Sequence, residues 1–174
     1  MTETKLPQNL TIVCHTIRWA AVAWLIWALY RTTMYWADSS AILRSYSRLA
    51  SRELTSMSTA QHATSYLVIL IDWAFAALIV AALWRLLAYY LRGEIFTNSA
   101  VGAMHTLGLA ALAATAVDLL ARPLLLTIVS SGTTTRMWFE PNDILHAVMS
   151  LLILLFAHIH KAGLAMADDI RQIV

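Results

Sequence analysis

The sequence predicts an all-α integral membrane protein, in which a bundle of four transmembrane helices forms a single domain over residues 1–174. Its 174 residues are 60% hydrophobic and 13% charged, whereas soluble domains are about half apolar and about a quarter charged. Only 5 Gly and 3 Pro punctuate the chain, which favours long helices. Four apolar stretches reach the length of about 20 residues that a helix needs to cross the hydrocarbon core.

The first two predicted helices cover residues of about 10–36 and 66–91. Arg18 lies within the first apolar run, and the second holds a single acid, Asp72, ahead of Arg85. Tyr and Trp prefer the headgroup level of a membrane, so aromatic residues near the ends of the predicted spans support these boundaries. Those residues are Tyr30, Tyr35, Trp36, Trp84, Tyr89, Tyr90 and Trp138.

The third and fourth predicted helices cover residues of about 99–129 and 144–166. Asp118 and Arg122 lie inside the third helix, toward its end. Pro141-Asn142-Asp143 is typical of a turn that leads into the N-terminus of the fourth helix. Polar residues that cap the third helix by accepting its free N–H groups stand just before it: Thr97, Asn98 and Ser99.

The first loop has a pattern of its own. Apolar residues recur there at helical spacing, and arginines follow at four-residue steps on another face. Two interpretations stay open: an amphipathic helix on the membrane surface with its arginines among lipid phosphates, or a cap packed on the bundle. The apolar residues are Ile42, Leu43, Tyr46, Leu49, Ala50, Leu54 and Met57, and the arginines are Arg44, Arg48 and Arg52.

Three ionisable residues lie inside the predicted spans on the same membrane side: Asp72, Asp118 and Arg122. A charge in hydrocarbon costs at least ~2.5 kcal/mol, so such a residue faces a partner or a cavity. Asp118 and Arg122 are four residues apart on one helix and can pair directly. We therefore expect an intramembrane polar cluster. It either fixes the register of the bundle or acts as a proton- or ligand-sensitive switch.

Histidines raise the question of a metal or haem. His15, His105, His158 and His160 lie on one side of the membrane together with Cys14, the single cysteine. Imidazole and thiolate are ligands of zinc and copper, and two histidines suffice for a b-type haem. Only ligand type and shared depth support such a site, because interfacial histidines also bond to headgroups and water. We predict no cofactor and keep His15, His105 and His160 as the candidate metal ligands.

The segment between the second and third helices resembles the G-x-x-F-T … L-x-x-x-G signature of an uncharacterised bacterial four-helix membrane family, domain of unknown function 2975. The run 92–97 reads Arg-Gly-Glu-Ile-Phe-Thr and is followed by Val101 and Met104, while Ala100 and His105 depart from the usual residues of the family. The residues that carry the signature are Gly93, Phe96, Thr97 and Gly108.

The end of the chain, residues 163–174, is similar to the acidic tail with which proteobacterial members of that family finish. The resemblance implies the bacterial inner membrane, with both termini and the loop 93–98 in the cytoplasm. Counting arginines and lysines does not decide the orientation. The resemblance also implies regulation, since members are often encoded beside small helix-turn-helix regulators.

Function is predicted at the level of a non-enzymatic membrane module, because no nucleophile–base constellation or nucleotide motif occurs. One hypothesis is a sensor or regulatory module that binds a protein partner, such as a transcriptional regulator, through the tail residues Asp168, Asp169 and Arg171. An alternative is a structural or accessory subunit of a larger membrane complex, and a third is a haem or metal carrier. A homo-oligomer stays open. The net charge of +2 is too small for a nucleic-acid surface.

Overall fold

The computed structural model describes residues 8–51, 53–132 and 140–173, with side chains placed up to Met166 in the last of these segments. This part of the chain is helical and contains no strand, which confirms the predicted all-α class. The helices in chain order are α1 (Gln8–Ala37), α2 (Ser39–Ala50), α3 (Thr59–Leu91), α4 (Asn98–Ser130) and α5 (Pro141–Ile173).

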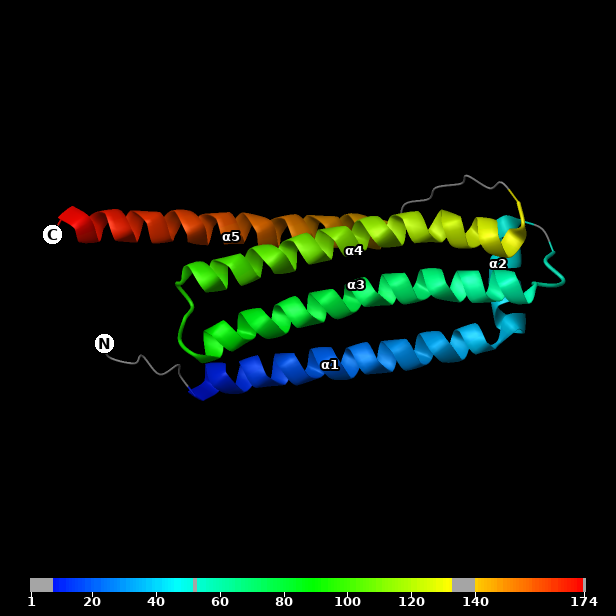
Figure 1. Cartoon of the computed structure of the whole chain (residues 1–174), viewed down its shortest axis with the longest axis horizontal. Coiled ribbons are helices and arrows are strands. Elements are labelled where there is room, and N and C mark those ends of the chain that lie inside the picture. The colour runs from blue at the N-terminus through cyan, green and yellow to red at the C-terminus, as the bar shows by residue number, and fades with distance from the viewer. Residues whose placement is uncertain (1–7, 52, 133–139, 174) are drawn as a thin grey trace.

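Four of these helices, α1, α3, α4 and α5, are long and apolar enough to cross a membrane. They run side by side in the spatial order α1, α3, α4, α5, so each packs on the next one along the chain (Figure 1). The short α2 lies across one end of the bundle, which we call the α2 end (Figure 1). α1 begins and α5 finishes at the opposite end, which we call the termini end.

Two helices differ from the boundaries expected from the sequence. α3 begins at Thr59 rather than near Tyr66, because Ser58 and Gln61 form a capping box in which each side chain accepts from the other's backbone N–H. α5 begins at Pro141, where a missing N–H costs nothing, and continues past the expected end at 166 to Ile173. Hydrophobicity marks only the part of a helix that faces lipid, so it misses these polar turns.

α4 lies between α3 and α5 and comes into close contact with α5 at Gly108. A Cβ on this glycine would lie 2.7 Å from Cγ of Leu154, closer than two carbon atoms pack. On its other side α4 packs against α3 through the buried cluster Ala82, Leu86, Ala103 and Leu107. Without a hydrophobic driving force in lipid, such close backbone approach supplies the van der Waals contact that associates helices.

α1 is held to α3 by an aromatic contact near the termini end. The guanidinium of Arg18 lies 3.8 Å from the centre of the Trp84 ring, and Trp19 packs edge-on against the same ring at 5.4 Å. A cation over an aromatic face is attracted by the ring quadrupole, more strongly where water is excluded. The interaction explains how an arginine is accommodated inside the first transmembrane helix.

The α2 end is closed by a small core of its own. Ile42 of α2 is 0% exposed and packs with Trp36, Leu125 and Val129, joined by Tyr46. Of the two interpretations of the first loop, the structure therefore has the cap packed on the bundle, with the exposed Arg44 and Arg48 pointing away from this core. Leu54 and Met57 pack on the cluster from outside the helix, and Arg52 lies outside the described residues.

Hydrogen bonds lock this closure. The indole N–H of Trp36 donates to Ser65 Oγ at 3.2 Å, and His62 Nε2 bonds to the Trp36 carbonyl oxygen at 2.7 Å. Gln61 Nε2 donates to the carbonyl of Ile128 at 2.9 Å and so ties the start of α3 to the end of α4. Buried polar groups that found no partner would cost free energy, so these bonds fix how α1, α3 and α4 meet.

Asp38 starts α2. Its carboxylate accepts from the backbone N–H groups of Ser40 and Ala41 and from the Ser40 hydroxyl. These hydrogen bonds, that of the Ser40 hydroxyl above all, hold the pKa of Asp38 below its ordinary value. In the same helix, burial raises the pKa of the Tyr46 phenol.

We predict that Gly108→Ala lowers the free energy of unfolding by about 1–3 kcal/mol, because the new methyl group overpacks the α4–α5 contact. An SDS titration of the purified protein measures it. Gly102→Ala is the matched control, since a Cβ there meets nothing within 4 Å and alanine favours a helix by about 1 kcal/mol. Gly108→Ala combined with Leu154→Ala should recover stability. Equal changes in the free energy of unfolding for Gly108→Ala and Gly102→Ala would refute the close approach of α4 to α5.

A second prediction concerns acid. The pKa of Asp38 is lowered in the folded state, so its contribution to α2 is present above the ordinary value of about 4 and is lost as pH falls through the lower folded value. Hydrogen exchange of the α2 amides, corrected for intrinsic rates, should rise as pH falls below about 4. Asp38→Asn still caps but does not titrate, and it should flatten this dependence. If Asp38→Asn keeps the same pH dependence of α2 exchange as the wild type, a group other than Asp38 causes that dependence.

Candidate functional site

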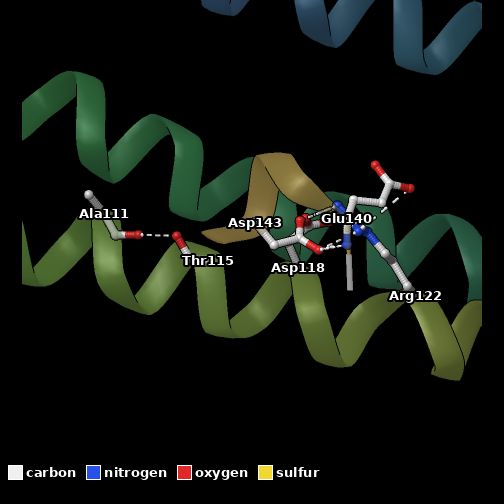
Figure 2. A network of polar contacts seen from close by, with 6 residues as sticks. All are labelled: Ala111, Thr115, Asp118, Arg122, Glu140 and Asp143. Carbon is white, nitrogen blue, oxygen red and sulfur yellow. Dashed lines mark hydrogen bonds and ion pairs between the residues drawn. The ribbon is translucent and has the colours of Figure 1, made fainter. Parts of the chain in front are cut away.

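Arg122 is the centre of an ion cluster inside the bundle. Its Nη1 and Nη2 atoms donate to the two carboxylate oxygens of Asp143, each at 2.9 Å, and Nη2 also donates to Asp118 at 2.6 Å. Glu140 lies 3.8 Å from Nη1. Figure 2 shows the guanidinium of α4 among these carboxylates, two of which come from the start of α5. Planar guanidinium binds a carboxylate through two parallel bonds, which fixes geometry as well as charge.

Asp143 also caps the start of α5. Its Oδ2 accepts from the backbone N–H of Glu140 at 2.8 Å, as the third helical residue does in a capping box. Pro141 fills the first helical position, and the partial positive charge of the helix N-terminus favours the acid there. One carboxylate therefore begins α5 and also binds it to α4.

Burial differs across the cluster. The Asp143 side chain is 3% exposed, that of Arg122 is 23% exposed and that of Asp118 is 37% exposed. A charge pair gains strength where water is excluded, so the Arg122–Asp143 pair is stronger than the Arg122–Asp118 pair. It is also the pair that links α4 to α5. Asp118 lies at the rim of the cluster and faces a groove.

That groove runs along one face of the bundle and has a volume of about 390 Å³. All four long helices contribute to its wall, from Trp24 of α1 to Met149 of α5. The polar part of the lining consists of Asp72, Thr115, Asp118, His146 and Ser150. The Thr115 and Ser150 hydroxyls donate to carbonyls of their own helices, at 3.0 Å and 2.7 Å. Asp72 and Asp118 are the acids of the groove.

The cluster expected from the sequence therefore differs in membership from the observed one. Asp118 and Arg122 form an ion pair, whereas Asp72 makes no ion pair or hydrogen bond with any residue that the structure describes. It is within electrostatic range of both. Sequence reasoning missed the role of Asp143. The segment Pro141-Asn142-Asp143 indicated only a turn leading to a helix cap, and not the ion pair of Asp143 with Arg122.

Three of the four signature residues shape the backbone: Gly93, Thr97 and Gly108. Gly93 has a φ of 77° and ends α3, with its own N–H and that of Glu94 donating to the last carbonyls of the helix, as in a Schellman motif. Thr97 caps α4 by accepting from Ala100. Gly108 is the close-approach point of α4 and α5. These roles build the α3–α4 hairpin and place it against α5.

Phe96, the remaining signature residue, is 71% exposed, and its ring stacks on His160 of α5 at 5.7 Å. The candidate metal ligands thus do not converge: His105 lies beside His158, with ring centres 6.0 Å apart, and His15 is exposed on α1. Among the described residues there is no group of three or more His, Cys, Asp or Glu placed to hold a metal ion.

The tail residues Asp168, Asp169 and Arg171 belong to the last turns of α5, and their side chains lie outside the described part of the structure. The backbone shows that α5 continues without a break from Pro141 to these turns. In Figure 1 this helix projects beyond the α3–α4 loop at the termini end.

We predict that Arg122→Gln costs roughly 2 kcal/mol of stability, because it removes the two hydrogen bonds from Arg122 to Asp143, and polar contacts between membrane helices are worth about 1 kcal/mol each. Unfolding in SDS measures the loss, and hydrogen exchange should rise in the first turns of α5. Asp118→Asn is the control and should cost less, since the Asp118 side chain is 37% exposed and its substitution leaves the Arg122–Asp143 pair intact. A larger effect of Asp118→Asn would contradict this ranking.

No curated protein and no solved structure matches the chain. A protein-family profile matches residues 48–174, from α2 through the end of α5, and therefore covers most of the chain and the whole ion cluster. The chain belongs to the family described as protein of unknown function (DUF2975).

Proposed function

We propose that this chain is a non-enzymatic sensor or regulatory module of the bacterial inner membrane that acts through a protein partner. The observation that carries the proposal is the course of α5. One uninterrupted helix begins in the Arg122 cluster, crosses the membrane and ends in the acidic tail. A change in the cluster is thereby connected mechanically to the segment that a partner in the cytoplasm would meet.

The packing of α5 supports such a role. α5 is an edge helix that packs on α4, and most of its large apolar side chains are exposed. α5 packs extensively on α4, and two of its contacts are the close approach at Gly108 and the ion pair of Asp143 with Arg122. Packed helices shift as units when an interface contact changes. The contact of Asp143 is the one whose strength depends on charge.

The topology follows from the same arrangement. The antiparallel helices bring the start of α1 and the end of α5 to one end of the molecule, which supports the proposal that both termini share a side. Family membership supports the cytoplasm as that side. The tail of α5 and the loop Arg92–Asn98 then face the same compartment as a soluble regulator.

A structural or accessory subunit is the second candidate. It is favoured by the tryptophans Trp19, Trp24 and Trp27 on the edge helix α1, which are 63%, 56% and 57% exposed. A row of this kind suits docking against another membrane helix. An obligate subunit would purify in mild detergent with stoichiometric membrane partners, whereas a regulatory module would capture a soluble partner through its tail.

We expect a chain truncated after Met166 to lose its cytoplasmic partner in a pull-down from mild detergent, with captured proteins identified by mass spectrometry. Arg122→Gln in the full chain should change the captured amount at least threefold at equal expression, because it releases α5 from α4. Arg85→Gln, an exposed arginine of α3 outside the cluster, is the matched control. Capture that survives the truncation would remove the tail as the interface and end the proposal.

A further inference from the structure

We propose that the groove on the face of the bundle binds an amphiphilic organic cation that enters from the lipid. This inference rests on the proposed function in that it names the class of molecule that the sensor detects. The groove has a volume of about 390 Å³, within the range of small-molecule sites. Its wall is made by α1, α3, α4 and α5 together, so an occupant contacts every transmembrane helix at once.

The charges that line the groove favour a cation as its ligand. The lining holds two acids, Asp72 and Asp118, and one histidine, His146. Arg122 is engaged by Asp118, Asp143 and Glu140, and the Asp72 carboxylate has no ion pair or hydrogen bond among the described residues. An ionisable residue inside a membrane pairs with an opposite charge or lines a substrate path. Asp72 thus lacks the positive partner that a bound cation would supply.

The rest of the lining selects an organic cation. The apolar part of the lining includes Ala76, Ile79, Met149 and Ile153, and Trp24 adds an aromatic side chain. Ca²⁺ takes about six to eight oxygen ligands, whereas the side chains here offer two carboxylates and two hydroxyls that already donate within their own helices. An apolar cation instead buries its body against the aliphatic side chains and is attracted to the tryptophan face.

The position of the groove sets the route of entry. Asp72 lies 13 residues after Thr59, which is about 20 Å along the axis of α3, in a helix long and apolar enough to cross a membrane. Trp24 and Met149, which line the groove from the edge helices α1 and α5, are 56% and 50% exposed. The mouth therefore faces hydrocarbon, and a ligand must first partition into the bilayer, which an amphiphilic cation does and a hydrated ion does not.

Occupancy would be transmitted to α5. A positive charge beside Asp72 also lies near Asp118, which shares Arg122 with Asp143. The ligand competes with Arg122 for Asp118 and leaves the guanidinium to Asp143 and Glu140. The consequence is a change in the ion pairs that hold the start of α5 to α4.

The test uses the full-length purified protein and two probes of equal shape and opposite charge, tetraphenylphosphonium and tetraphenylborate. Equilibrium dialysis in detergent, with a detergent blank, should show saturable binding of the cation at one per chain and no saturable binding of the anion. Asp72→Asn should weaken cation binding at least tenfold. Glu94→Gln is the matched control, because that carboxylate pairs with Arg92 outside the groove, and it should bind as the wild type does.

Ala76→Phe keeps both carboxylates and fills the groove, so it should also abolish binding. This second variant, with size-exclusion chromatography as the check of folding, protects the test against a misfolded Asp72→Asn. Unchanged affinity in both variants, or equal binding of the two probes, would overturn the proposal. The proposal would also be overturned if Na⁺ bound to the protein and tetraphenylphosphonium did not. It would likewise be overturned if a second copy of the chain occupied the groove, seen as a dimer that Ala76→Phe disrupts.

The two proposals fail separately. If tetraphenylphosphonium does not bind but the tail still captures a partner that Arg122→Gln modulates, the sensor remains and the ligand class is wrong. If the cation binds as expected but truncation after Met166 leaves capture unchanged, the groove is a binding site and the tail is not its output.

Discussion

The packing of α4 against both of its neighbours is the contact on which the rest of the structure depends. α3 lies on one side of α4 and α5 on the other, and lipid offers no hydrophobic gain for either association. What remains is close van der Waals contact and a few polar bonds. Gly108 supplies the first by bringing the backbone of α4 up to Leu154, and Arg122 supplies the second. The edge helices α1 and α5 take their positions from this centre.

Polarity is concentrated at one depth for a physical reason. α5 begins beside Arg122, and the first N–H groups of any helix have no partner within it. These groups need acceptors outside the helix, and Asp143 accepts from the backbone N–H of Glu140 while it binds Arg122. Nearby, Pro123 cannot donate to the carbonyl of Leu119, although α4 continues through it. Helix start, proline and ion cluster thus share one level, where a groove opens.

The two ends of the bundle are built differently. At the α2 end, Ile42 and Trp36 close the space between α1, α3 and α4, and hydrogen bonds of Gln61 and His62 fix the closure. At the termini end the Gly93 turn is short, and α5 projects beyond it (Figure 1). One end is therefore closed by packed side chains, whereas at the other end α5 extends beyond the neighbouring helices.

The four spans could be predicted from the sequence because length and apolar composition are local properties, and backbone groups in lipid must be satisfied within each helix. The pairing of Asp118 with Arg122 could also be predicted, since four residues on one helix determine their neighbourhood. The place of α2 could not, because an amphipathic helix has the same pattern whether its apolar face meets lipid or protein.

The rest of the candidate site was decided by tertiary structure. Asp143 is 21 residues from Arg122, and only the antiparallel packing of α5 on α4 brings their charges together. The same packing leaves Asp72 without an ion pair or hydrogen bond among the residues that the structure describes, although its place on the same membrane side favoured the cluster. The sequence by itself determined which segments cross the membrane, since that depends on the solvent each segment needs. Which polar side chains meet depended on how the helices lie beside one another, and this is a property of the whole chain.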